Sequence, residues 1–122
     1  MDLIMPQVFD RIKAASGELV RCKRYNIGVW NMDTTPSVQV AWTWADLSKI
    51  LSVEPMILTD TGNALYTLCG LGDSASGKTR GGIYIITTTY ITLMRTDAMI
   101  FDGTAFDDPA MNRGYIFVWY VE

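Results

Sequence analysis

The stretch 72–79, with the sequence GDSASGKT, has the residue types and spacing that most directly suggest chemistry. It matches the phosphate-loop pattern GxxxxGK[ST], in which backbone N–H groups surround phosphates, a lysine reaches the terminal phosphates and a hydroxyl holds magnesium. Asp102, which follows an apolar run at 99–101, would fit the magnesium-holding aspartate of such a site. A nucleotide-binding protein is therefore an alternative function, and its binding residues would be Gly72, Gly77, Lys78, Thr79 and Asp102.

The residues after this motif argue against a phosphate site. Such a loop must open a helix, because the helix N-terminus completes the anion site. Here Arg80 is followed by Gly81 and Gly82, and then by the β-branched and aromatic run 83–89. Glycine costs ~1 kcal/mol relative to alanine in a helix, and β-branched residues favour strands. We therefore interpret 72–82 as a glycine-rich loop and expect no cofactor.

Other chemistry-bearing residues form no recognisable catalytic set. The chain has no histidine, which removes Ser-His-Asp triads, Cys-His dyads and histidine-ligated zinc. Asp102, Asp107 and Asp108 could together hold a hard cation, but their spacing does not match the EF-hand loop. Asp-Gly and Asp-Pro pairs are also typical of turns, so we interpret these aspartates as turn residues. We expect no metal site and no catalytic residues, and hence no enzyme.

The charge of the chain bears on whether it binds nucleic acid, and its cysteines bear on its redox compartment. Ten Lys and Arg against 13 Asp and Glu give a net charge of −3, and the densest basic stretch is only Arg21, Lys23 and Arg24. A nucleic-acid binder needs a basic stripe to neutralise phosphates, so we expect no such binding through a basic patch. Cys22 and Cys69 are far apart in sequence, and we interpret both as buried thiols in a reducing compartment.

Targeting signals are not recognisable in the sequence. The N-terminus has neither a basic n-region nor a long apolar region, so we expect no signal peptide. The longest apolar-looking stretch, 83–94, has 12 residues, too few for a helix across a ~30 Å hydrocarbon core. We therefore expect no membrane association, and an intracellular location, or the virion if the protein is viral.

Hydrophobic periodicity predicts two helices. The first runs from Pro6 to Ser16, because Ile4, Val8 and Ile12 recur at helical spacing. The second is a short helix at 45–52. The rest of the chain has strand character, with alternating or continuously apolar runs between turn residues. The predicted strands are 18–24, 38–44, 56–59, 64–71, 83–95, 98–102 and 114–121.

The connections between these strands decide the fold class. They are mostly short, and short connections imply antiparallel pairing. We therefore predict one domain, 1–122, of the α+β or mainly-β class, with an antiparallel sheet of about six or seven strands, an N-terminal helix and one short helix. The last strand, 114–121, is apolar on both faces and is expected to be central or covered by a partner.

Composition favours an assembly subunit as the leading function. The chain is 49% apolar and only 19% charged, and monomers rarely expose large apolar patches. We expect a non-enzymatic structural subunit of a homo-oligomer or larger complex, such as a viral capsid, tail or decoration component. A small inhibitor or sequestering protein acting on a host factor is a further alternative. The expected interface residues are aromatic: Trp42, Trp44, Tyr115, Phe117, Trp119 and Tyr120.

Overall fold

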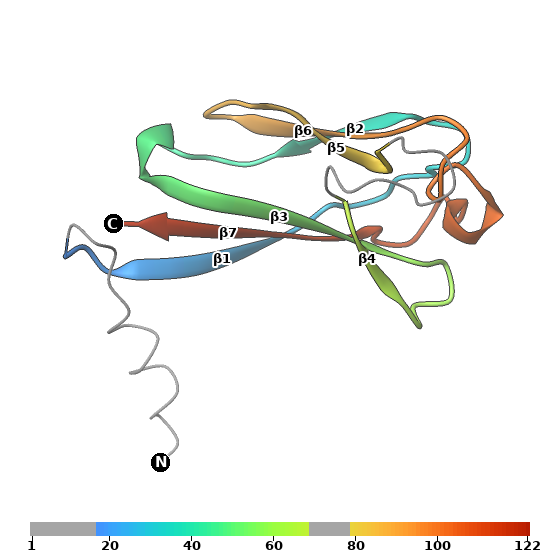
Figure 1. Ribbon diagram of the computed structural model, residues 1–122, viewed down its shortest axis with the longest axis horizontal. Helices are drawn as coiled ribbons and strands as arrows, with labels where there is room; N and C mark the ends of the chain where they lie inside the picture. Colours follow the sequence, from blue (N-terminus) through green and yellow to red (C-terminus); the bar gives the residue numbers. More distant parts are fainter. Residues whose placement is uncertain (1–16, 69–78) are drawn as a thin grey trace, which may run out of the picture.

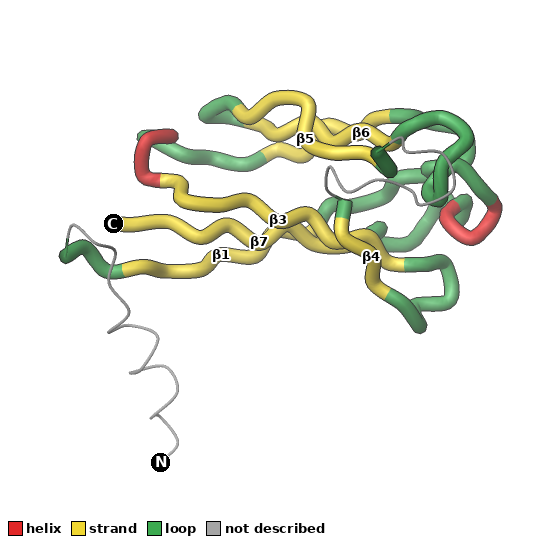
Figure 2. The backbone as a smooth tube through the Cα atoms, in the orientation of Figure 1, coloured by secondary structure: helices red, strands yellow, loops and turns green. Residues whose placement is uncertain are grey.

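The computed structural model describes residues 17–68 and 79–122, and this part of the chain folds into two stacked antiparallel sheets (Figure 1). The four-stranded sheet has the order β1-β7-β3-β4, and the three-stranded sheet the order β2-β6-β5. The tube view shows the two sheets as separate layers (Figure 2). The elements are β1 (Val20–Asn26), β2 (Ser37–Ala41), the 3₁₀ turn η1 (Leu47–Lys49), β3 (Ile50–Leu58), β4 (Leu65–Thr67), β5 (Gly81–Ile86), β6 (Tyr90–Arg95), the 3₁₀ turn η2 (Thr104–Phe106) and β7 (Gly114–Val121).

The hydrophobic core lies between the two sheets. The four-stranded sheet contributes Ile57, Ile116 and Val118, which are all fully buried. The facing sheet contributes Ile91 and Leu93, which are equally buried. Successive side chains of a strand point to opposite faces, so burying every second residue fills one face of each sheet. Of the two predicted classes, α+β and mainly β, the described structure is mainly β, and the predicted antiparallel pairing is confirmed. The prediction of one sheet of about six or seven strands is wrong, because the seven described strands divide into two sheets that pack face to face.

The strand β7 is the centre of the larger sheet, as its apolar sequence predicts. It pairs with β1 on one side, where Val118 lies opposite Lys23, and with β3 on the other, where Val118 lies opposite Val53. The predicted strand 114–121 is confirmed with the same bounds. The hairpin predicted around 60–63 is also confirmed, because Leu58 at the end of β3 pairs with Leu65 at the start of β4.

The two helix predictions have different outcomes. The helix predicted at 6–16 lies outside the described residues, and no described segment is a helix of seven residues or more. Nor does the described part of the chain contain a helix long and apolar enough to cross a membrane.

The short helix predicted at 45–52 is wrong, because the chain makes only the 3₁₀ turn η1 before β3 begins. One oxygen of Asp46, Oδ1, accepts hydrogen bonds from the backbone N–H and the hydroxyl of Ser48, at 3.0 and 2.6 Å. At Ile50 the backbone is already extended, with φ −80° and ψ 127°. Pairing of β3 with β7 outweighs the weak helix propensity of this segment.

The strand predicted at 83–95 is wrong as a single element, because it is a hairpin of β5 and β6. Thr87 makes the turn: its hydroxyl accepts from the N–H groups of Thr89 and Tyr90, at 3.2 and 3.0 Å. Its own N–H donates to the carbonyl of Tyr90 at 2.9 Å. A threonine hydroxyl bonded to nearby backbone is a known turn-forming device, and it competes with strand propensity.

The strand predicted at 98–102 is also wrong, because this segment is a turn. Ala98 has a positive φ of 62°, which no strand residue adopts. The Asp102 carboxylate accepts from the N–H of Ala98 at 2.8 Å, and the N–H of Asp102 donates to the carbonyl of Met99 at 3.0 Å. The strands predicted at 18–24 and 38–44 are present, with bounds shifted to those of β1 and β2.

Gly114 provides a test of the close approach of β7 to β3. Its φ is 152°, and a Cβ added there would lie 1.9 Å from the carbonyl oxygen of Met56. We expect Gly114→Ala to lower the free energy of unfolding by about 3 kcal/mol, since both the backbone and the neighbour must shift. Gly82→Ala is the control, because a Cβ there meets nothing within 4 Å. Urea unfolding measures both, and equal midpoints for the two variants would contradict the prediction.

Candidate functional site

The outer face of the four-stranded sheet carries three aromatic side chains in a line. Along β7, Ile116 and Val118 are fully buried and point into the core. The alternation of a strand therefore turns Tyr115, Phe117 and Trp119 to the opposite face, where they are partly exposed. No described strand lies over that face (Figure 1). We call Tyr115, Phe117 and Trp119 the aromatic row.

Polar side chains border the aromatic row on both sides. The two strands that pair with β7 place one exposed charged residue each beside Phe117, with Arg24 on β1 and Glu54 on β3. The row therefore lies between a positive and a negative side chain. The residues opposite the row are Asn26, Arg24 and Cys22 on β1, and Met56, Glu54 and Ser52 on β3.

Two ring contacts hold the side chains on this face. The rings of Tyr115 and Phe117 have centroids 6.4 Å apart, and the Arg24 guanidinium carbon lies 4.8 Å from the Tyr115 centroid. Such a cation–π contact contributes ~0.5–1 kcal/mol at an exposed site. Cys22 is exposed on this face, so its prediction as a buried thiol is wrong, while Cys69 lies outside the described residues. Desolvation and the Glu54 carboxylate raise the pKa of the Cys22 thiol, which disfavours the nucleophilic thiolate. The face offers stacking surface and charge rather than a reactive group.

The interface residues predicted from the sequence divide into two sets. Tyr115, Phe117 and Trp119 form the aromatic row, at the surface of the described structure. Trp42, Trp44 and Tyr120 instead lie on the inner side of the sheets, where Trp42 is buried and the other two are partly buried. An interface role for these three residues stays a prediction.

Trp42, Trp44 and Tyr120 pack against one another. The centroids of Trp44 and Tyr120 are 4.8 Å apart, and those of Trp42 and Trp44 are 6.1 Å apart, both edge-on. The indole N–H of Trp42 donates to the carbonyl of Thr87 at 2.7 Å. These aromatics join the two sheets, because Tyr120 follows Ile116 and Val118 on the inner face of β7.

A fully buried arginine, Arg113, holds the loops at the start of β7 together. Its guanidinium donates to the carbonyls of Trp30, Leu58 and Asp108, at 2.9, 2.9 and 3.1 Å. It also forms an ion pair with Asp60 at 2.9 Å. Arg113 is not predictable as a site residue from the sequence, since a lone arginine before an apolar run carries no sequence signal of burial.

Asp60, the partner of Arg113, also orders the turn at Asp107 and Asp108. Its two carboxylate oxygens accept from the N–H groups of those residues, each at 3.1 Å. Burial alone would raise the pKa of Asp60, but the hydrogen bonds from Asp108, Arg113 and Asp107 lower it below its usual value. The hydrogen bond with Asp60 in turn raises the pKa of Asp107. The turn chemistry expected for Asp107 and Asp108 is present, with Asp60 as a partner that the sequence did not indicate.

Asp102, the aspartate that could have held magnesium, instead lies beside a second buried arginine, Arg95. Arg95 donates to the carbonyl of Met32 and to the carboxylate of Asp97, and its Nη2 lies 3.5 Å from Oδ1 of Asp102. Asp102 thus pairs with an arginine and caps the turn at Ala98. Across residues 17–68 and 79–122, no three His, Cys, Asp or Glu side chains lie close enough together to hold a metal ion.

The candidate nucleotide loop is described only at its end. Gly72, Gly77 and Lys78 lie outside the described residues. Thr79 lies just before β5, and its hydroxyl is 3.4 Å from that of Thr96. Residues 81–86 form β5, so the segment after the motif does not supply the helix N-terminus on which a phosphate loop depends.

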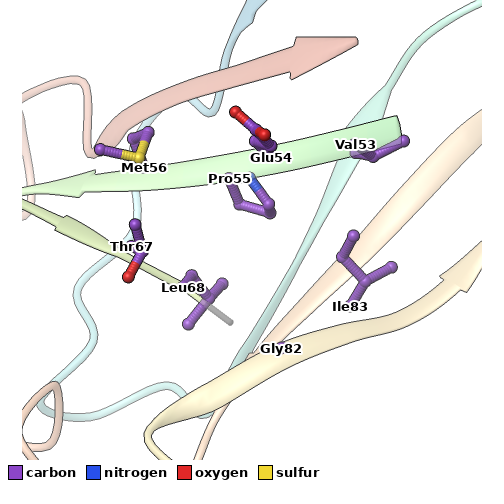
Figure 3. Close-up of a pocket in the computed structure, with 8 residues that line it drawn as sticks. All are labelled: Val53, Glu54, Pro55, Met56, Thr67, Leu68, Gly82 and Ile83. Atoms are coloured by element: carbon purple, nitrogen blue, oxygen red, sulfur yellow. The ribbon is translucent and has the colours of Figure 1, made fainter. Parts of the chain in front are cut away.

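A cavity of about 470 Å³ lies between β3 and β4 of one sheet and β5 of the other (Figure 3). Pro55 and Ile83 face the space between the sheets, whereas Glu54 points away from Ile83. The cavity is therefore apolar and offers no reacting group. Its lining residues are Val53, Glu54, Pro55, Met56, Thr67, Leu68, Gly82 and Ile83.

Comparisons of the chain with protein family models, with curated proteins and with solved structures found no match. The side chains and their arrangement are therefore the basis for a functional assignment.

Removing Arg113 tests its role at the start of β7. We expect Arg113→Met to lower the free energy of unfolding by about 3–5 kcal/mol, because it leaves buried carbonyls and Asp60 without their donor. Lys49→Met is the control, since Lys49 makes one exposed hydrogen bond, to the carbonyl of Glu122 at 2.8 Å. We expect it to cost less than about 1 kcal/mol. Urea unfolding compares the two, and a loss for Arg113→Met no greater than for the control would refute the role.

Proposed function

We propose that the protein is a non-enzymatic assembly subunit that forms a homo-oligomer through the outer face of its four-stranded sheet. The observation that carries the proposal is the aromatic row. Tyr115, Phe117 and Trp119 lie on the central strand of the larger sheet, on the face that no described strand covers. Partly exposed aromatic side chains on an uncovered sheet face are typical of interaction sites.

The composition of the face supports a protein partner. Tyrosine, tryptophan, phenylalanine and arginine are enriched at protein interfaces, and tryptophan, tyrosine and arginine dominate their binding energy. The aromatic row supplies the first three residue types, and Arg24 lies against it. Charged residues border the row and do not interrupt it, which is the usual arrangement of an apolar interface centre with a polar rim.

The buried charged groups support a structural role for the rest of the domain. Arg113 and Arg95 donate to backbone carbonyls and to carboxylates of neighbouring loops. Their bonding holds the connections between strands in place. We attach no second function to the loop 72–79, because β5 stands where a phosphate site requires a helix.

Mass in solution tests this function. At low micromolar concentration we expect sedimentation equilibrium to give at least twice the chain mass of 13.6 kDa. Trp119→Lys should raise the dissociation constant by about 30-fold, the effect of losing ~2 kcal/mol at an interface centre. Tyr84→Lys is the matched control, since Tyr84 is an aromatic residue 71% exposed on β5, away from the row.

Two results would count against the function. A wild-type mass of 13.6 kDa that does not change with concentration would refute homo-oligomer formation. If Trp119→Lys and Tyr84→Lys changed the dissociation constant equally, the outer face of the four-stranded sheet would not be the interface.

A further inference from the structure

The charges beside the aromatic row specify how a second copy can pack on it. Arg24 and Glu54 both lie opposite Phe117, on β1 and β3 respectively. Neighbouring strands are ~4.8 Å apart, so their Cα atoms are separated by about 10 Å across the row. Both side chains are exposed, and within the described residues neither has an ion-pair partner. Each is therefore available to a group on a partner.

Two copies that pack face to face by the same surface are related by a two-fold axis in the plane between the sheets. If that axis runs parallel to β7, it exchanges the two sides of the row. Arg24 of one copy then faces Glu54 of the other, and the reverse contact occurs as well. If the axis runs across the strands, Arg24 faces Arg24 and Glu54 faces Glu54. Only the first arrangement brings opposite charges together.

We propose that two copies of the chain pack through their aromatic rows about a two-fold axis parallel to β7, with reciprocal Arg24–Glu54 ion pairs. This inference rests on the proposed function and adds to it the partner and its orientation. In this arrangement each residue of the row packs beside its own counterpart, at the ~10 Å separation of stacked sheets. Cys22 on β1 then lies opposite Ser52 on β3 of the second copy, so neither flank of the row places like charges together.

Charge reversal tests the orientation. Arg24→Glu alone would oppose two glutamates at each contact, and Glu54→Arg alone would oppose two arginines. We expect each single variant to raise the dissociation constant of the dimer at least about tenfold. The double variant restores opposite charges in exchanged positions, and we expect its dissociation constant to be within about threefold of the wild type. Sedimentation equilibrium at low ionic strength measures all four proteins.

A matched control separates the contact from net charge and from folding. Lys23→Glu makes the same change in net charge as Arg24→Glu, next to it on β1 but with the opposite side-chain direction. We expect it to leave the dissociation constant within about threefold of the wild type. Arg24, Glu54 and Lys23 are all exposed, so each variant should remain folded. Arg24 and Lys23 each lie over aromatic rings, so we expect urea unfolding to show a loss of stability of no more than about 1 kcal/mol for their variants.

The possible results distinguish this inference from the function on which it rests. Weakening by both single variants and recovery in the double variant would support the two-fold arrangement. A wild-type oligomer that the single variants leave unchanged would overturn the arrangement but leave homo-oligomer formation intact. A double variant as weak as the single variants would do the same. A monomeric wild type would overturn both proposals.

Discussion

The pairing of β7 between β1 and β3 is the constraint on which the rest of the structure depends. A central strand is bonded on both edges, so its register assigns every side chain to one face or the other. Ile116 and Val118 consequently fill the core against the three-stranded sheet, and Tyr115, Phe117 and Trp119 take the outer face. A shift of one residue would bury the aromatic row and expose the core. The same pairing that stabilises the fold therefore creates its candidate interaction surface.

The loops at the start of β7 secure that register. Arg113 precedes the strand and is 0% exposed, and it donates to backbone carbonyls from three separate parts of the chain. Its Asp60 partner accepts from the backbone at Asp107 and Asp108. A buried charge with each of its three nitrogens bonded tolerates little displacement, since an unpaired charge would be costly there. The conformation of these loops and the register of β7 are thus coupled through the side chain of Arg113.

The strands that were predicted well have strong local patterns. The apolar run 114–121 and the alternating run 38–44 formed strands because their side-chain periodicity matches a sheet. The threonines at 87–89 were misassigned for the opposite reason, because β propensity was uniform across them. What stops the strand there is the Thr87 hydroxyl, which bonds the backbone two and three residues later. At 45–52 the apolar spacing suited a helix, but β7 offered Ile50 and Val53 a strand partner.

The sequence by itself indicated a strand-rich fold of the α+β or mainly-β class, a last strand that is central or covered by a partner, and aromatic residues as candidate interface residues. Those properties are local, since periodicity and composition are read from neighbours along the chain. Only the tertiary structure decided that Trp42, Trp44 and Tyr120 pack inside while Tyr115, Phe117 and Trp119 face outward. It also decided that Arg24 and Glu54 lie on either side of Phe117, and that Arg113 meets Asp60. These relations depend on strand order and register, which arise from pairing between segments far apart in the sequence.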